Sequence, residues 1–119
     1  MKTRILLMIE SDPRQSPRPA EAMRVAAGLL PWGKVEPVLY LHGQALQLLD
    51  SSLDAEEWMD GEGLREHLAS LAAGGVRFHA QKRQAEPACQ AQSGRECPKE
   101  IGLDELAALA ASCQAVARF

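Results

Sequence analysis

The chain has 119 residues, enough for one domain with a core that needs no disulfide or metal. Its hydrophobic content of 46% and charged content of 24% are ordinary for a globular protein, and only 4% is aromatic, so the core is aliphatic. The net charge of -3 provides no basic surface for nucleic acid, and we expect no nucleic-acid partner.

The amino-terminal run from Arg4 to Ile9 (RILLMI) is apolar and rich in branched side chains, which predicts a strand buried on both faces of a parallel sheet. It is too short for a signal peptide or a membrane helix, so we expect no membrane association. The chain has three cysteines and no C-x-x-C motif. This pattern argues against a secreted disulfide framework and indicates a reducing, cytoplasmic location.

A helix and a second strand follow the polar, proline-rich segment 11–19. Ser16 and Pro17 predict the start of the helix. Apolar residues recur along the helix at three- and four-residue steps and form one apolar face: Ala22, Met23, Ala26, Ala27 and Leu30. Val35 to Leu41 (VEPVLYL) predicts the strand, and Pro37, which lacks an amide hydrogen, predicts that this strand lies at an edge of the sheet.

The middle of the chain predicts a short helix over 43–49 and a longer one that ends at Gly74 and Gly75. The longer helix has an apolar stripe of Leu64, Leu68, Leu71 and Ala72. Residues 76–81 predict a third strand. One of its faces carries Val76, Phe78 and Ala80, and the other, which meets solvent or another subunit, carries Arg77, His79 and Gln81.

Residues 82–100 predict a long polar loop that contains Cys89 and Cys97. Loops of this length in compact domains are usually functional or disordered. An amphipathic helix with Leu103, Leu106, Ala107 and Ala110 follows, and 115–119 (AVARF) predicts a final short strand. The alternation of strands and helices indicates a single α/β domain over 1–119, with a mostly parallel sheet of four or five strands.

Several segments, in order, resemble the DsrE/DsrF-like family of small sulfur-relay proteins: ESDP after the first strand, AEAMRVAAGLL, VEPVLYLHGQAL, GGVRFHAQ and CQAVARF. The resemblance covers nearly the whole chain. It implies a flavodoxin-like three-layer fold, assembly into trimers or hexamers, and sulfur-relay protein partners. Family members active in sulfur transfer carry a cysteine at the end of the third strand, where it accepts sulfane sulfur as a persulfide. This sequence has Gln81 there, and glutamine is not a nucleophile.

Two kinds of function remain open. In the first, Cys89, or as second choice Cys97, is a persulfide carrier whose thiolate is stabilised by nearby basic residues: Lys82, Arg83, Arg95 and Lys99. The competing interpretation is a solvated loop in which the thiols of Cys89 and Cys97 have no function. The third cysteine, Cys113, is most simply a small core residue.

In the second, the chain is a non-catalytic binding module or assembly subunit. Ligands of parallel sheets bind at the carboxyl ends of the strands. Those ends supply a candidate pocket of Ser11, Asp12, His42 and Gln81, in which His42 is an acid, base or donor. We expect no metal, because the cysteines and histidines lack ligand spacing, and no nucleotide cofactor, because there is no glycine-rich phosphate loop.

Overall fold

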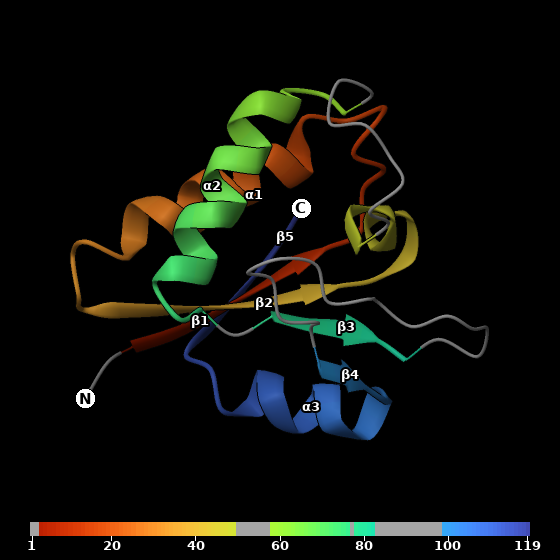
Figure 1. Ribbon diagram of the computed structural model, residues 1–119. Coiled ribbons are helices and arrows are strands. Elements are labelled where there is room, and N and C mark those ends of the chain that lie inside the picture. The colour runs from red at the N-terminus through yellow and green to blue at the C-terminus, as the bar shows by residue number, and fades with distance from the viewer. Residues whose placement is uncertain (1–2, 50–57, 77, 83–98) are drawn as a thin grey trace.

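The computed structural model describes residues 3–49, 58–76, 78–82 and 99–119. They form three layers, with a five-stranded sheet between helices on both of its faces (Figure 1). Every strand pair in this sheet is parallel. The predicted fold class, a single three-layer α/β domain with a parallel sheet, is therefore confirmed.

The sheet has the strand order β4-β3-β2-β1-β5. Its strands are β1 (Thr3–Ile9), β2 (Val35–Leu41), β3 (Phe78–Gln81), β4 (Lys99–Ile101) and β5 (Ala115–Arg118). The helices are α1 (Arg18–Leu29), α2 (Gly61–Ala73) and α3 (Leu103–Ala111), with a 3-10 helix, η1 (Gly43–Leu49), after β2. Because all strands run the same way, their carboxyl ends meet at one edge of the sheet, which we term the carboxyl edge.

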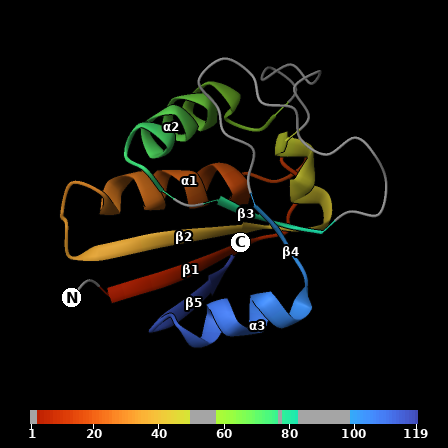
Figure 2. The same cartoon turned by 60° about the horizontal axis from the view of Figure 1, so that its bottom comes forward.

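Two apolar cores fill the spaces on either side of the sheet. Helices α1 and α2 cover one face and α3 covers the other (Figure 2). The larger core lies under α1 and α2 and includes Leu7, Ile9, Met23, Leu39, Leu41, Leu64 and Leu71. The smaller core, which we term the α3-side core, lies under α3 and consists of Leu6, Val38, Tyr40 and Ile101, with Met8, Leu106, Leu109, Ala110 and Cys113 packed against it. Alternate residues of β1 and β2 thus enter opposite cores, as expected for strands buried on both faces.

The predicted edge position of β2 is wrong, since β2 pairs with β1 on one side and with β3 on the other. Even-numbered residues of this segment bond to β1: the Lys34 oxygen accepts from β1, and the His42 nitrogen donates to it. Successive amides point to opposite sides, so the Pro37 nitrogen faces β3. The described pairing with β3 begins only at Leu39. The missing N–H of Pro37 therefore interrupts none of the described ladder.

The predicted loop over 82–100 ends earlier than expected, because Lys99 and Glu100 belong to β4. A three-residue strand with polar residues at its start is too short for a periodic pattern. Residues 83–98 of the predicted loop lie outside the described residues. The end of α2 matches the prediction: Gly74 is its C-cap, and Gly75 has a φ of 74°, in the left-handed region that glycine adopts without strain.

None of the helices in the described ranges has the length and apolar content needed to cross a membrane.

Candidate functional site

The carboxyl edge brings together polar residues that follow β1 and β2 and end β5. The backbone fixes their positions. The Glu10 nitrogen donates to the oxygen of Phe119, 2.9 Å away, and the His42 nitrogen donates to the oxygen of Ile9, 3.0 Å away. These bonds extend the pairing of β1 with β5 and with β2 by about one residue beyond the strands. The side chains of Glu10, His42 and Arg118 consequently start from adjacent strand ends.

Four side chains form a group that we term the Glu10 cluster: Glu10, His42, Arg118 and Tyr40. The Oε2 atom of Glu10 lies 3.8 Å from Nε2 of His42, and its Oε1 atom lies 3.6 Å from Nη2 of Arg118. The His42 ring stacks on Tyr40, with centroids 5.3 Å apart and an angle of 24° between the planes. One carboxylate thus lies between an imidazole and a guanidinium.

Burial within the Glu10 cluster increases from Arg118 to Tyr40. The side chain of Arg118 is 68% exposed, whereas that of His42 is 22% exposed. The His42 Nε2 atom is buried and makes no hydrogen bond within the described part of the chain, because 3.8 Å exceeds hydrogen-bond distance. Tyr40 is 2% exposed, and this burial raises the pKa of its hydroxyl. The cluster is therefore anchored in the α3-side core and open to solvent at Arg118.

Gln81 lies beside this cluster at the exposed end of β3. Its Oε1 atom accepts a hydrogen bond from the Gly43 nitrogen, 3.2 Å away. Gly43 has a φ of 58°, so the chain turns sharply after His42 in a conformation that favours glycine. The last register pair of β2 and β3 is Leu41 with Ala80. The Gln81 side chain therefore extends the link between these strands by one hydrogen bond beyond the backbone pairing.

Ser11 and Asp12 have local roles in the loop between β1 and α1. The Asp12 Oδ1 atom accepts from the Arg14 nitrogen at 2.9 Å, an Asx turn, and the Ser11 nitrogen donates to the Phe119 oxygen at 3.4 Å. Across the described ranges, no hydrogen bond or ion pair joins the side chain of Ser11 or Asp12 to His42 or Gln81. Of the predicted pocket, the structure links His42 and Gln81 through Gly43, and it places Ser11 and Asp12 in the neighbouring loop.

Sequence reasoning missed Glu10 and Arg118 as site residues. Each had a detectable signal. Glu10 is the first polar residue after the apolar run of β1, at the strand end where a ligand is expected. Arg118 is the one charged residue in the final segment AVARF. What the sequence did not show is that β5 pairs with β1, which is the pairing that brings Arg118 to Glu10.

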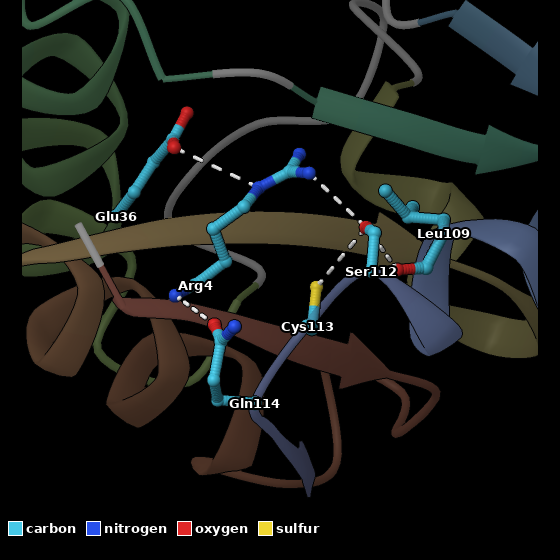
Figure 3. Close-up of polar contacts among 6 residues, drawn as sticks. All are labelled: Arg4, Glu36, Leu109, Ser112, Cys113 and Gln114. Atoms are coloured by element: carbon cyan, nitrogen blue, oxygen red, sulfur yellow. Dashed lines mark hydrogen bonds and ion pairs between the residues drawn. The ribbon is translucent and has the colours of Figure 1, made fainter. Parts of the chain in front are cut away.

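The candidate carriers Cys89 and Cys97 lie outside the described residues. Cys113, which follows α3, is half-buried against the α3-side core. Figure 3 shows its surroundings: its Sγ atom lies 4.0 Å from the Ser112 hydroxyl, which accepts a 3.0 Å hydrogen bond from Nη1 of Arg4. Arg4 lies near the start of β1 and Glu10 follows its end, so Cys113 lies near the opposite edge of the sheet from the Glu10 cluster.

Within the described ranges, no group of three or more histidine, cysteine, aspartate or glutamate side chains is arranged to hold a metal ion.

Comparison with solved structures gives a match over the whole length of both chains. The crystal structure of the YchN protein from E. coli covers 100% of each chain with a TM-score of 0.70, at 20% sequence identity. No family model and no curated protein sequence matches the chain. At this identity the likeness shows the fold alone. The chain therefore shares the fold of YchN.

Proposed function

We propose that the chain is a DsrE-like protein of sulfur metabolism or sulfur relay, and that its carboxyl edge binds a small anion rather than carrying sulfur on β3. The DsrE-like fold supports the connection with sulfur chemistry. The Glu10 cluster carries the binding role, since it places an exposed guanidinium and an imidazole at the edge where parallel sheets bind ligands.

The donors of the Glu10 cluster suit an oxyanion. A guanidinium has five N–H donors, and Glu10 contacts only Nη2 of Arg118. The other donors have the planar geometry that binds oxyanions in pairs. His42 adds a ring N–H as a second donor. In a sulfur pathway, the matching ligand class is a sulfur oxyanion, for which thiosulfate and sulfite are suitable probes.

Titration of thiosulfate and sulfite into isotope-labelled protein, followed by the amide resonances of Gly43 and Arg118, tests the binding role. We expect saturable shifts with the intact chain and at least tenfold weaker binding with Arg118→Ala. The matched control is Arg24→Ala, which removes an exposed arginine from α1 and leaves binding unchanged. Absence of saturable binding, or binding that Arg118→Ala does not weaken, would contradict the proposal.

A second candidate function is a persulfide carrier that uses Cys89 or, as second choice, Cys97. The observation that favours it is Gln81: its side chain bonds to Gly43 and has no nucleophile, so a sulfur-carrying chain of this kind needs a thiol elsewhere. Lys82 and Lys99, both exposed, flank the segment that contains the two cysteines and supply positive charge that stabilises a thiolate.

Intact-mass spectrometry after incubation with a sulfane-sulfur donor, with and without reductant, tests the carrier. The expected result is a reversible gain of one sulfur atom that disappears when Cys89 and Cys97 are both replaced by serine. Cys113→Ser is the control and retains the gain. If the wild-type chain gains no sulfur, the carrier function is excluded, while the anion-binding proposal stands on its own titration.

The proposal includes self-association into a trimer or hexamer and contact with other sulfur-relay proteins, both of which the family resemblance implies. It also includes the cytoplasmic location that the cysteine content predicts. Light scattering at tens of micromolar tests the assembly, and a monomeric mass there would contradict it.

A further inference from the structure

An apolar side chain, that of Met8, lies among the polar groups of the Glu10 cluster. In the sheet register Met8 pairs with Arg118 on one side and with Tyr40 on the other. Met8 and Tyr40 both contribute to the α3-side core. Glu10 follows Met8 by two residues, so its side chain leaves β1 on the same face. Because Met8 is only partly buried, it supplies an apolar floor between the guanidinium and the two rings.

Val116 extends this floor along β5, at the edge of the sheet (Figure 2). Ala117 and Phe119 pack against the core under α1 and α2. Side chains alternate along a strand, so Val116 and Arg118 point to the other face, where α3 lies. Two residues of a strand span about 6.6 Å, so the Cα atoms of Val116 and Arg118 are near neighbours. Helix α3 leaves Val116 48% exposed.

Met8 and Val116 are diagonal neighbours on adjacent strands, because the register pairs Leu6 with Val116 and Met8 with Arg118. We term Met8 and Val116 the apolar floor. It begins inside the Glu10 cluster and continues away from the carboxyl edge. The cluster therefore adjoins an apolar surface that its charged groups do not use.

The position of Val116 distinguishes it from other exposed apolar side chains. The described ranges contain five that are large: Val25, Trp32, Met59, Leu103 and Val116. Single exposed apolar residues are normal and need no function. Of these five, only Val116 shares a strand and a face with Arg118. The guanidinium of Arg118 makes no hydrogen bond to the described residues, because its 3.6 Å contact with Glu10 exceeds hydrogen-bond distance. An apolar surface beside a cation with free donors fits a ligand that has both an anionic and an apolar part.

We propose that the ligand of the carboxyl edge is an organic anion, whose charged head binds at Arg118 and His42 and whose apolar chain lies on Met8 and Val116. This ligand class rests on the anion-binding role proposed above for the Glu10 cluster and narrows it to a sulfur oxyanion that carries an alkyl group. Alkanesulfonates are the matching probes. Inorganic thiosulfate and sulfite then fill the position of the head alone.

Both parts of such a ligand find a partner in this site. The Nε2 atom of His42 is buried and has no hydrogen-bond partner within the described residues, whereas buried polar atoms normally have one. An anionic head supplies an acceptor for the ring N–H of His42. The flexible thioether side chain of Met8 adapts its shape to an apolar chain. The head therefore gives orientation, and the chain adds affinity.

The length of the chain sets the size of the expected effect. A methylene that is fully buried strengthens binding about fourfold, and one on a floor that is open to solvent on its outer side strengthens it about twofold. Hexanesulfonate has five methylenes more than methanesulfonate. We therefore expect hexanesulfonate to bind at least tenfold more tightly than methanesulfonate.

Titration of the alkanesulfonate series into the whole chain tests this ligand class. Arg118→Ala is expected to weaken methanesulfonate and hexanesulfonate by the same factor. 1-Hexanol, which has the chain without the charge, is expected to bind at least tenfold more weakly than hexanesulfonate. Equal affinities for the two sulfonates, or for hexanesulfonate and 1-hexanol, would overturn the organic anion. The anion site itself is judged separately, by the thiosulfate titration.

Two substitutions of Val116 test where the chain lies. Val116→Thr keeps the branched shape and the strand preference of valine and replaces one methyl group by a hydroxyl. We expect it to lower the ratio of hexanesulfonate to methanesulfonate affinity at least twofold, whereas Val116→Ile retains the ratio. Val25→Thr, at a position of α1 that is 41% exposed, is the matched control and leaves the ratio unchanged. A ratio that Val116→Thr does not lower would refute the proposed floor.

Nuclear Overhauser contacts in the saturated hexanesulfonate complex locate the chain directly. We expect contacts from the alkyl protons to the methyl groups of Val116 and Met8, and none to those of Val25. A saturated complex in which the alkyl protons contact neither Val116 nor Met8 would overturn the proposal.

Discussion

Glu10 and His42 occupy equivalent positions at the ends of two adjacent parallel strands, and their side chains approach to 3.8 Å. The register of β1 and β2 pairs Ile9 with Leu41, so the next residues of the two strands start side by side. Leu6 and Tyr40 point into the α3-side core, and side chains alternate along a strand. Glu10 and His42 therefore leave the sheet on that same side. Their contact is a direct consequence of strand register, and it makes Glu10 the link between His42 and Arg118.

Glu10→Gln is expected to change the anion affinity of the Glu10 cluster while leaving the stability of the domain nearly unchanged. Partly exposed ion pairs contribute about 0.2–1 kcal/mol, so we expect the free energy of unfolding to change by less than about 1 kcal/mol. The carboxylate repels a bound anion, and two unit charges about 4 Å apart in water interact by about 1 kcal/mol. Its removal is therefore expected to strengthen thiosulfate binding about fivefold. The titration described for Arg118→Ala measures this, and weaker binding by Glu10→Gln would contradict an anion site.

Gln81→Cys tests whether a thiol at the end of β3 can accept sulfur. The substitution removes the acceptor of the Gly43 amide, for which we expect a cost of about 0.5–1.5 kcal/mol. It also places a thiol at the position where the family resemblance of the sequence implies a sulfur-accepting cysteine. With Cys89 and Cys97 replaced by serine, we expect this variant to gain one sulfur atom from a sulfane-sulfur donor. Gln81→Ser, which also loses the glutamine carboxamide, is the matched control and gains none. The same mass gain for both variants on incubation with the donor would show that a thiol at the end of β3 does not accept sulfur.

Most of the fold was predictable because hydrophobic periodicity reports burial directly. The apolar run of β1 identified a strand with both faces covered, and Leu64 and Leu71 marked the buried side of α2. Pro37 led to an error because a local rule was applied to the whole strand. A missing N–H weakens a sheet only where a neighbouring strand would accept its hydrogen bond. Whether β3 extends far enough to pair beside Pro37 cannot be seen in the sequence of β2.

The site was only partly predictable, for a related reason. His42 and Gln81 follow strands whose ends were visible in the sequence, and the structure links them through Gly43. Arg118 meets Glu10 only because β5 returns beside β1, and pairing between residues more than a hundred positions apart leaves no local pattern. Asp12 was expected to face a ligand, yet its carboxylate accepts from the Arg14 amide two residues later. Short-range hydrogen bonding by aspartate competes with exposure to a pocket.

Leu71→Ala tests the packing of α2 on the rest of the domain. Leu71 is completely buried in the larger core, so its truncation is expected to lower the free energy of unfolding by about 2–5 kcal/mol. Val25→Ala, at a position that is 41% exposed on α1, is the control and is expected to change it by no more than about 0.5 kcal/mol. Urea denaturation measures both. Similar losses for the two variants would mean that α2 does not pack against this core.

The ionisation of the buried Tyr40 hydroxyl is expected to lower the stability of the domain at alkaline pH. It is the only tyrosine in the chain, so ultraviolet absorbance of the phenolate reports on it alone. Burial raises the pKa of Tyr40 above the ordinary value of 10.0. Below pH 10.0 the hydroxyl is protonated in both the folded and the unfolded chain, and stability is unaffected. Above pH 10.0 the unfolded chain loses the proton first, so the free energy of unfolding falls as pH rises.

Tyr40→Phe removes this titration and is expected to make the alkaline loss of stability shallower. The lysines titrate in both chains, so their contribution cancels when the two pH profiles are subtracted. Urea denaturation at several pH values above 10 measures the difference, and the absorbance titration of the folded wild type locates the phenolate. A phenolate that forms at or below pH 10.0 in the folded chain, or parallel pH profiles for the two chains, would show that Tyr40 is not desolvated in the α3-side core and would remove the anchor on which His42 stacks.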